Sequence, residues 1–73
     1  MDIEGTVKLQ SSNLSTSSYD SQKKTLTLTF NEGGIYEYYA VPQIVDYELR
    51  QAASSGKYFH SFIRTKYSFK RVG

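Results

Sequence analysis

Alternating apolar and polar residues mark the clearest element of the chain, a strand over residues 25–30. Leucine or phenylalanine occupies positions 26, 28 and 30, and threonine occupies the positions between them. A period of two with β-branched residues on the polar side is typical of a half-buried strand. The Asn-Glu-Gly-Gly segment at 31–34 supplies glycines for a hairpin turn. We therefore predict that residues 35–39 return as the second strand of a hairpin.

The register of this hairpin decides which face of the sheet each tyrosine occupies, because a slip of one residue reverses every side chain. If Phe30 pairs with Ile35, Glu37 falls on the apolar face without a partner, which costs several kcal/mol. If Phe30 pairs with Tyr36, both Tyr36 and Tyr38 face inward and Glu37 faces outward. We predict the second register, because it leaves no carboxylate in the core.

Two segments with helical spacing follow the hairpin. Apolar residues recur at intervals of three and four over 43–53, directly after Pro42, which suits the first turn of a helix. Residues 57–65 show the same spacing, although their aromatic side chains also have strand propensity. We predict a helix at 43–53 and a second short helix near 57–65, with Ser55 as its N-cap.

The two ends of the chain carry weaker patterns. Residues 1–10 are predicted to be an N-terminal tail or an extra edge strand, and residues 13–19 a short, polar first strand. Residues 67–72 alternate loosely, as a last strand or an extended tail would. The expected fold is a single α+β domain over residues 11–73. Its antiparallel sheet has about three strands and is covered on one face by one helix plus a second short helix.

Composition limits the chemistry of the chain. A domain of 73 residues builds a thin core but no deep, water-excluding active site. The absence of cysteine excludes disulfides, thiolate nucleophiles and cysteine-bound metals, and a single histidine, His60, excludes a multi-histidine site. We therefore expect a non-catalytic protein with no cofactor and no metal. No apolar run reaches membrane-spanning length and no signal peptide is apparent, so we expect a cytoplasmic location without membrane association.

Charge is distributed unevenly along the chain. The first 48 residues carry three lysines against seven acidic residues, a net charge of −4, whereas the last 25 carry six lysines and arginines and no acid, +6. Such asymmetry either indicates an anionic partner for the C-terminal third or balances the acidic part within the domain.

A series of short motifs resembles a known family in order and spacing. It comprises Tyr36-x-Tyr38, Val41-Pro42, and Ser55-Gly56-x-Tyr58-Phe59 followed by Ile63-Arg64. Over roughly residues 11–71 the chain resembles the KTSC domain, named for a segment at the C-terminus of some lysyl-tRNA synthetases and found also as small free-standing bacterial and phage proteins. Ser17-Ser18 departs from this pattern, where an apolar residue is expected. The resemblance implies a single domain without assigned chemistry, and its association with a tRNA synthetase suggests RNA as a ligand.

The central tyrosines form the first candidate site. Tyr36 and Tyr38 serve either as a stacking platform for unpaired bases or as core residues under the helix. The predicted register favours the core interpretation. It also makes Tyr39 the exposed aromatic residue of the strand, on the same face as the threonines.

Basic residues interleaved with an aromatic residue form the second candidate site. They are Lys57, Arg64, Lys66, Tyr67, Lys70 and Arg71. Cations neutralise phosphates and rings stack on bases, so this pattern suits a nucleic acid. The alternative is a solvated C-terminus in which Arg64 pairs with Asp46 or Glu48. The leading hypothesis is a small module that binds RNA or single-stranded nucleic acid. The other is a protein-interaction module or accessory factor that uses a sheet edge or the Tyr39 face.

Overall fold

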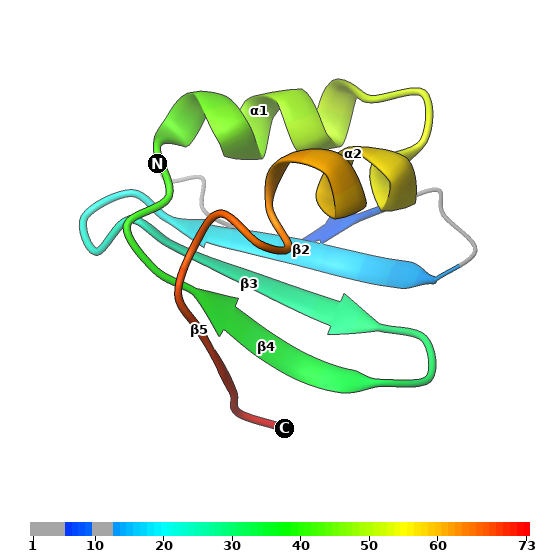
Figure 1. Ribbon diagram of the computed structural model, residues 1–73, viewed down its shortest axis with the longest axis horizontal. Coiled ribbons are helices and arrows are strands. Elements are labelled where there is room, and N and C mark those ends of the chain that lie inside the picture. Colours follow the sequence, from blue (N-terminus) through cyan, green and yellow to red (C-terminus); the bar gives the residue numbers. More distant parts are fainter. Residues whose placement is uncertain (1–5, 10–12) are drawn as a thin grey trace.

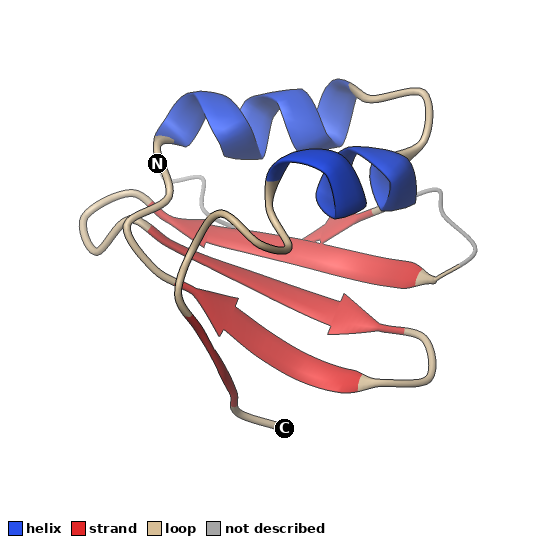
Figure 2. Ribbon diagram, in the orientation of Figure 1, coloured by secondary structure: helices blue, strands red, loops and turns tan. Residues whose placement is uncertain are grey.

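Five strands and two helices make up the computed structural model, which describes residues 6–9 and 13–73. In chain order the elements are β1 (Val7–Lys8), β2 (Leu14–Asp20), β3 (Thr25–Phe30), β4 (Gly34–Tyr38), α1 (Gln43–Gln51), α2 (Ser55–Phe62) and β5 (Phe69–Arg71). The strands form one antiparallel sheet in the order β1-β2-β3-β4-β5. Both helices lie over the same face of this sheet (Figures 1 and 2).

The α+β class is confirmed, but the prediction of about three strands is wrong, because the sheet has five. The two additional strands are the edges, β1 and β5. β1 pairs with β2, so the sheet begins before residue 11, while the remainder of the predicted N-terminal tail, residues 1–5 and 10, lies outside the described residues. β5 pairs with β4 and settles the C-terminal alternatives in favour of a strand.

The β3–β4 hairpin keeps the predicted faces with a different register. Tyr36 lies opposite Leu28, and Phe30 lies opposite Gly34 rather than Tyr36. The predicted pairing is therefore wrong by two residues, a shift that preserves the alternation of faces. Tyr36 and Tyr38 share the face of the buried leucines, as predicted, and Glu37 lies on the other face, opposite Thr27.

Helix α2 is confirmed, but its predicted N-cap is wrong. The N-cap is Ser54, whose hydroxyl accepts a hydrogen bond from the backbone N–H of Lys57 at 3.3 Å. Ser55 is instead the first helical residue and is buried. Its hydroxyl donates to the carbonyl oxygen of Leu49 at 3.4 Å, which ties α2 to α1. Serine is an equally suitable N-cap at position 54 or 55, so residue type alone does not decide which of the two caps α2.

The core lies between the sheet and the two helices. Fully buried residues come from both layers: Leu14, Leu26, Leu28, Val41, Leu49 and Ile63. Tyr19 joins them, and its hydroxyl donates to the carbonyl oxygen of Val41 at 2.6 Å. No helix in this described part of the chain is long and apolar enough to cross a membrane.

Ser17 places a hydroxyl in this core without a partner. It is 1% exposed, lies on β2 opposite Leu28, and its Oγ makes no hydrogen bond to any described residue. A buried polar group without a partner costs about 1–3 kcal/mol. We therefore expect Ser17→Ala to raise the free energy of unfolding by about 1 kcal/mol, measured by urea denaturation. Ser18→Ala, on the next and half-exposed residue, is the control and should change stability by less than about 0.5 kcal/mol. A clear loss of stability in Ser17→Ala would contradict this account.

Candidate functional site

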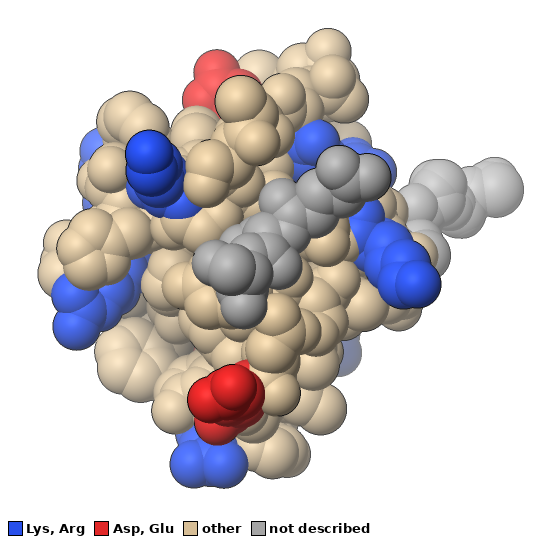
Figure 3. All heavy atoms as spheres, turned by 90° about the vertical axis from the view of Figure 1, so that its right-hand side faces the viewer, with Lys and Arg blue, Asp and Glu red and all other residues tan. Residues whose placement is uncertain are grey.

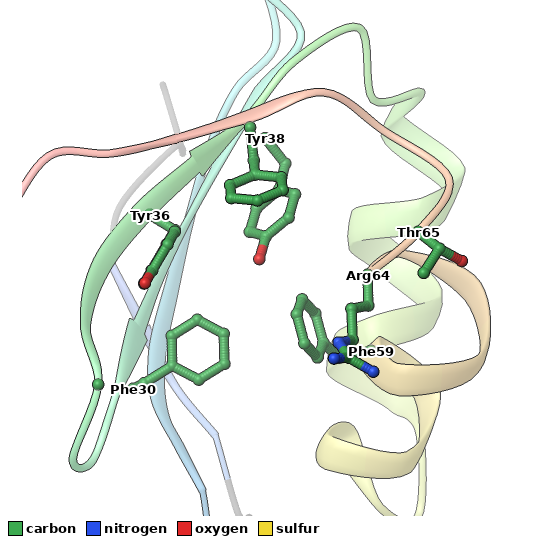
Figure 4. A pocket seen from close by; sticks show the side chains of 8 residues that line it. Phe30, Tyr36, Tyr38, Phe59, Arg64 and Thr65 are labelled. Atoms are coloured by element: carbon green, nitrogen blue, oxygen red, sulfur yellow. The ribbon is translucent and has the colours of Figure 1, made fainter.

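A groove opens between the sheet and the end of α2 (Figure 4). Its volume is about 540 Å³. It is lined by residues from β3, β4, β5 and the region of α2, namely Phe30, Gly33, Tyr36, Tyr38, Phe59, Arg64, Thr65 and Phe69. We call this feature the aromatic groove.

Five aromatic rings of the groove form a closed cycle of contacts. Phe30 meets Phe59 with 5.2 Å between ring centroids, and Tyr36 with 5.6 Å. Tyr38 meets Phe59 and Phe69, each at 5.6 Å. The contact of Tyr36 with Phe69, at 5.8 Å, closes the cycle. These separations are in the favourable range for aromatic pairs, so each ring holds its neighbours in place.

The rings differ in their access to solvent. Tyr38 and Phe59 are 4% and 6% exposed and form the inner end of the groove, while Phe69 is 56% exposed. Phe30 and Tyr36 lie between these extremes. Tyr36 therefore both packs against the core and lines the groove, so the two interpretations offered for it from sequence are compatible. An exposed ring beside buried ones offers a face on which a flat ligand can stack.

Two arginines lie at this site: Arg64 lines the groove, and Arg71 lies against the ring of Tyr36. Arg64 follows α2, and its side chain extends past Phe59 along one wall (Figure 4). Arg71 lies on β5, with its guanidinium carbon 5.9 Å from the ring centroid of Tyr36. Its Nε donates to the carbonyl oxygen of Gly73 at 2.9 Å. The aromatic surface is thus flanked by positive charge.

The hydroxyl of Tyr38 points into the groove (Figure 4). No hydrogen bond joins it to another described residue, and the oxygen atom itself is not fully buried. Burial, and then the neighbouring Tyr36, raise the pKa of Tyr38 above its ordinary value of 10.0, while the charge of Arg64 opposes this rise. The group is therefore protonated at neutral pH and available as a donor.

The remaining predicted site residues lie elsewhere. Lys57 borders a separate hollow with His60, and Lys70 pairs across the strands with Glu37 on the opposite face of the sheet. Lys66 is exposed in the turn after α2, and Tyr67 packs against the core. In the view of Figure 3, lysines and arginines are spread around the rim of the face rather than joined in one patch. The structure thus gathers Tyr36, Tyr38 and Arg64, with Arg71 beside them, and separates the rest.

Tyr39 does not offer a free aromatic surface. Its hydroxyl donates to a carboxylate oxygen of Glu37 at 2.9 Å, and this bond raises the pKa of Tyr39. It is half-buried and follows β4 on the face that carries the threonines. A protein partner on this face would meet a largely polar surface.

The acidic residues proposed as partners for Arg64 bond to other groups. Asp46 is buried and pairs with Arg50 at 2.8 Å, and burial raises the pKa of Asp46 although Arg50 opposes the rise. Glu48 accepts a hydrogen bond from the hydroxyl of Tyr58 at 2.7 Å. Burial and this bond raise the pKa of Tyr58 to about 12. Arg64 is exposed and lines the groove instead.

Sequence reasoning did not assign Phe30, Phe59 and Phe69 to a site, although they supply three of the five rings. A signal for Phe69 was present, because Phe69 and Arg71 share one face of an alternating segment. Within the described residues there is no group of three or more histidine, cysteine or acidic side chains that could hold a metal ion.

These features define a small α+β module with an aromatic groove at one side of its sheet. The chain belongs to the KTSC domain family, whose family model matches residues 10–67. It is similar in structure to a KTSC domain protein from Yersinia pestis, with a TM-score of 0.91 and 28% identity over 94% of this chain and 97% of that one.

Two curated relatives show the contexts in which similar sequences occur. A lysine–tRNA ligase from Trichormus variabilis is 44% identical over 54 residues, which cover 74% of this chain but only 10% of the ligase. An uncharacterized protein from Stutzerimonas stutzeri is 36% identical over 67 residues, 90% of this chain and 94% of that protein. The family therefore occurs both as a small part of a large enzyme and as a short protein of this length.

Proposed function

We propose that this chain is a small binding module whose aromatic groove takes an unpaired base of RNA or another single-stranded nucleic acid. The observation that carries the proposal is the closed cycle of five rings around an open groove that Arg64 lines, with Arg71 beside the ring of Tyr36. Stacking of a base on an aromatic ring contributes about 1–3 kcal/mol and tolerates any base. Arginine can neutralise the phosphates on either side.

The charge of the site favours an anionic ligand over a cationic one. Aromatic rings can also bind cations, but Arg64 and Arg71 would repel a cation placed among these rings. A nucleotide combines a flat ring with a negative charge and suits both features. The presence of a related segment in lysine–tRNA ligases adds support, because the named substrate of those enzymes is an RNA. In this proposed role the groove binds RNA in the cytoplasm.

Phe69 offers the sharpest test. It is 56% exposed, so Phe69→Ala should leave the fold intact, yet it removes the ring on which a base would stack. We expect this variant to weaken binding of a short, fluorescently labelled single-stranded RNA by about 5- to 100-fold, measured by anisotropy at about 50 mM salt. For the unchanged protein, the logarithm of the binding constant should fall linearly with the logarithm of the salt concentration, because phosphate contacts release counterions.

The matched control is Phe62→Ala. Phe62 is 53% exposed, close to the value for Phe69, but lies outside the groove and contacts only the ring of Tyr58 among the aromatic pairs described. This variant should bind RNA as the unchanged protein does. Equal effects of the two substitutions, or no binding at low salt, would refute the proposal.

A protein partner is the second candidate function, and exposed apolar residues on α1 favour it. Ile44 and Tyr47, separated by one turn of α1, are 57% and 54% exposed. This surface is an alternative to the Tyr39 face predicted from the sequence, where the hydroxyl of Tyr39 is bonded to Glu37. A partner bound there would be lost on Tyr47→Ala and retained on Phe69→Ala, the opposite of the pattern expected for RNA.

A further inference from the structure

Resting on the proposed function, we propose that the aromatic groove selects guanine and uracil over adenine and cytosine, through hydrogen bonds from the Tyr38 hydroxyl and the Arg64 guanidinium. Guanine and uracil carry a carbonyl oxygen on the base edge remote from the sugar, where adenine and cytosine carry an amino group. Stacking alone cannot make this distinction, because every base has a flat face. Selection between bases therefore depends on the polar groups of the groove that contact the base edge remote from the sugar.

The Tyr38 hydroxyl differs from those of Tyr19, Tyr39 and Tyr58, which are all hydrogen-bonded, and it belongs to the more buried of the two tyrosines that line the groove. The hydroxyl of Tyr19 donates to a backbone carbonyl, and those of Tyr39 and Tyr58 donate to glutamate carboxylates. Tyr38 is 4% exposed, yet its hydroxyl points into the groove and has no partner among the residues that the structure describes. A hydroxyl on a largely buried side chain, without an acceptor in the protein, is free to donate to an acceptor brought by a ligand.

The positive charge beside this hydroxyl favours a ligand acceptor over a ligand donor. The pKa of the hydroxyl is raised, so the proton is retained at neutral pH. Arg64 lines the same groove, and its charge acts on the Tyr38 hydroxyl. A guanidinium carries donors only. An entering carbonyl oxygen satisfies these groups, whereas an entering amino group brings positive hydrogens toward a cation.

The orientation of the rings is consistent with entry of a base edge. Tyr38 and Phe59 form the buried end of the groove, and Phe69 is exposed at its opening. A base stacked on Phe69 therefore directs its remote edge inward, toward Tyr38, and leaves its sugar and phosphate outside.

The experiment compares oligouridine with oligocytidine, two ligands of equal length and charge that differ at this edge. We expect the unchanged protein to bind oligouridine about tenfold more tightly, the usual size of the discrimination by one well-placed pair. Tyr38→Phe removes the hydroxyl and keeps the ring. It should reduce the affinity ratio, mainly by weakening oligouridine binding, and Arg64→Gln should reduce it as well. A partial loss of folded protein does not change this ratio, because it lowers the apparent affinity for both ligands by the same factor.

The control is Tyr39→Phe, the same substitution at the adjacent residue, whose hydroxyl bonds to Glu37 and does not line the groove. It should leave the ratio unchanged. Equal affinity of the unchanged protein for both ligands would overturn this inference and leave the proposed function standing. A preference that survives both Tyr38→Phe and Arg64→Gln would also overturn it, since the donor would be another group. Absence of binding to both ligands would refute the proposed function itself, and the inference with it.

Discussion

Phe59→Ala is expected to lower the free energy of unfolding by about 3–5 kcal/mol, the usual cost of removing a buried aromatic side chain. Phe59 is 6% exposed and belongs to the core, where its ring meets those of Phe30 and Tyr38. A domain of 73 residues has a total stability of about 4–11 kcal/mol. The substitution therefore removes a large share of the stability and also opens the cycle of rings.

The measurement is urea denaturation followed by circular dichroism, with Phe62→Ala as the control. Phe62 lies on the same helix, three residues further on, but is 53% exposed. We expect its replacement to lower stability by less than about 1 kcal/mol. Equal losses in the two variants would show that α2 does not present Phe59 to the sheet.

Gly34→Ala is expected to lower stability by about 1–3 kcal/mol and to loosen β5. Gly34 has a φ of 96°, a conformation that side chains rarely adopt without strain. A Cβ at this position would lie 2.6 Å from the carbonyl oxygen of Gly73 and 2.8 Å from a guanidinium nitrogen of Arg71. The methyl group would therefore displace Arg71 from the ring of Tyr36 and disturb the side of the groove that β5 forms.

Gly33→Ala provides the control within the same turn. Gly33 lacks the positive φ, and the nearest atom to an added Cβ is the Cβ of Phe30, at 3.3 Å. Its replacement should change stability by less than about 1 kcal/mol. Thermal unfolding measures the stability of both variants, and amide exchange of β5 shows whether that strand is loosened. Equal behaviour of the two variants would contradict the account of Gly34.

The central hairpin and both helices could be predicted because their patterns are long and regular. The threonine and leucine alternation at 25–30 defines β3, and the charge of Glu37 was sufficient to choose the faces of β4. The register itself could not be predicted, because moving the pairing by two residues leaves every side chain on the same face. β1 and β5 have only two and three residues, too few to display a period.

The candidate groove was only partly visible in the sequence. Tyr36 and Tyr38 stood out because they alternate within one strand, and Arg64 because it follows an apolar pair. Phe59 and Phe69 did not, since a small domain is expected to place most of its phenylalanines in the core. Phe69 meets Tyr36 and Tyr38 because β5 returns beside β4 after both helices, a contact between residues more than thirty positions apart that local patterns do not encode. Lys70 is separated from the groove for a different reason, because neighbouring residues of a strand point to opposite faces.

The short outer strands have a consequence for behaviour at high concentration. A long, flat edge strand exposes unpaired backbone groups and acts as a template for aggregation. Here β1 ends the sheet with two residues and β5 with three, and each carries an exposed lysine, Lys8 and Lys70. Among the described residues, each outer strand offers only two or three residues for another chain to pair with, and its lysine disfavours that approach. These edges should help the domain remain dispersed when it is abundant or when it is fused to a larger protein.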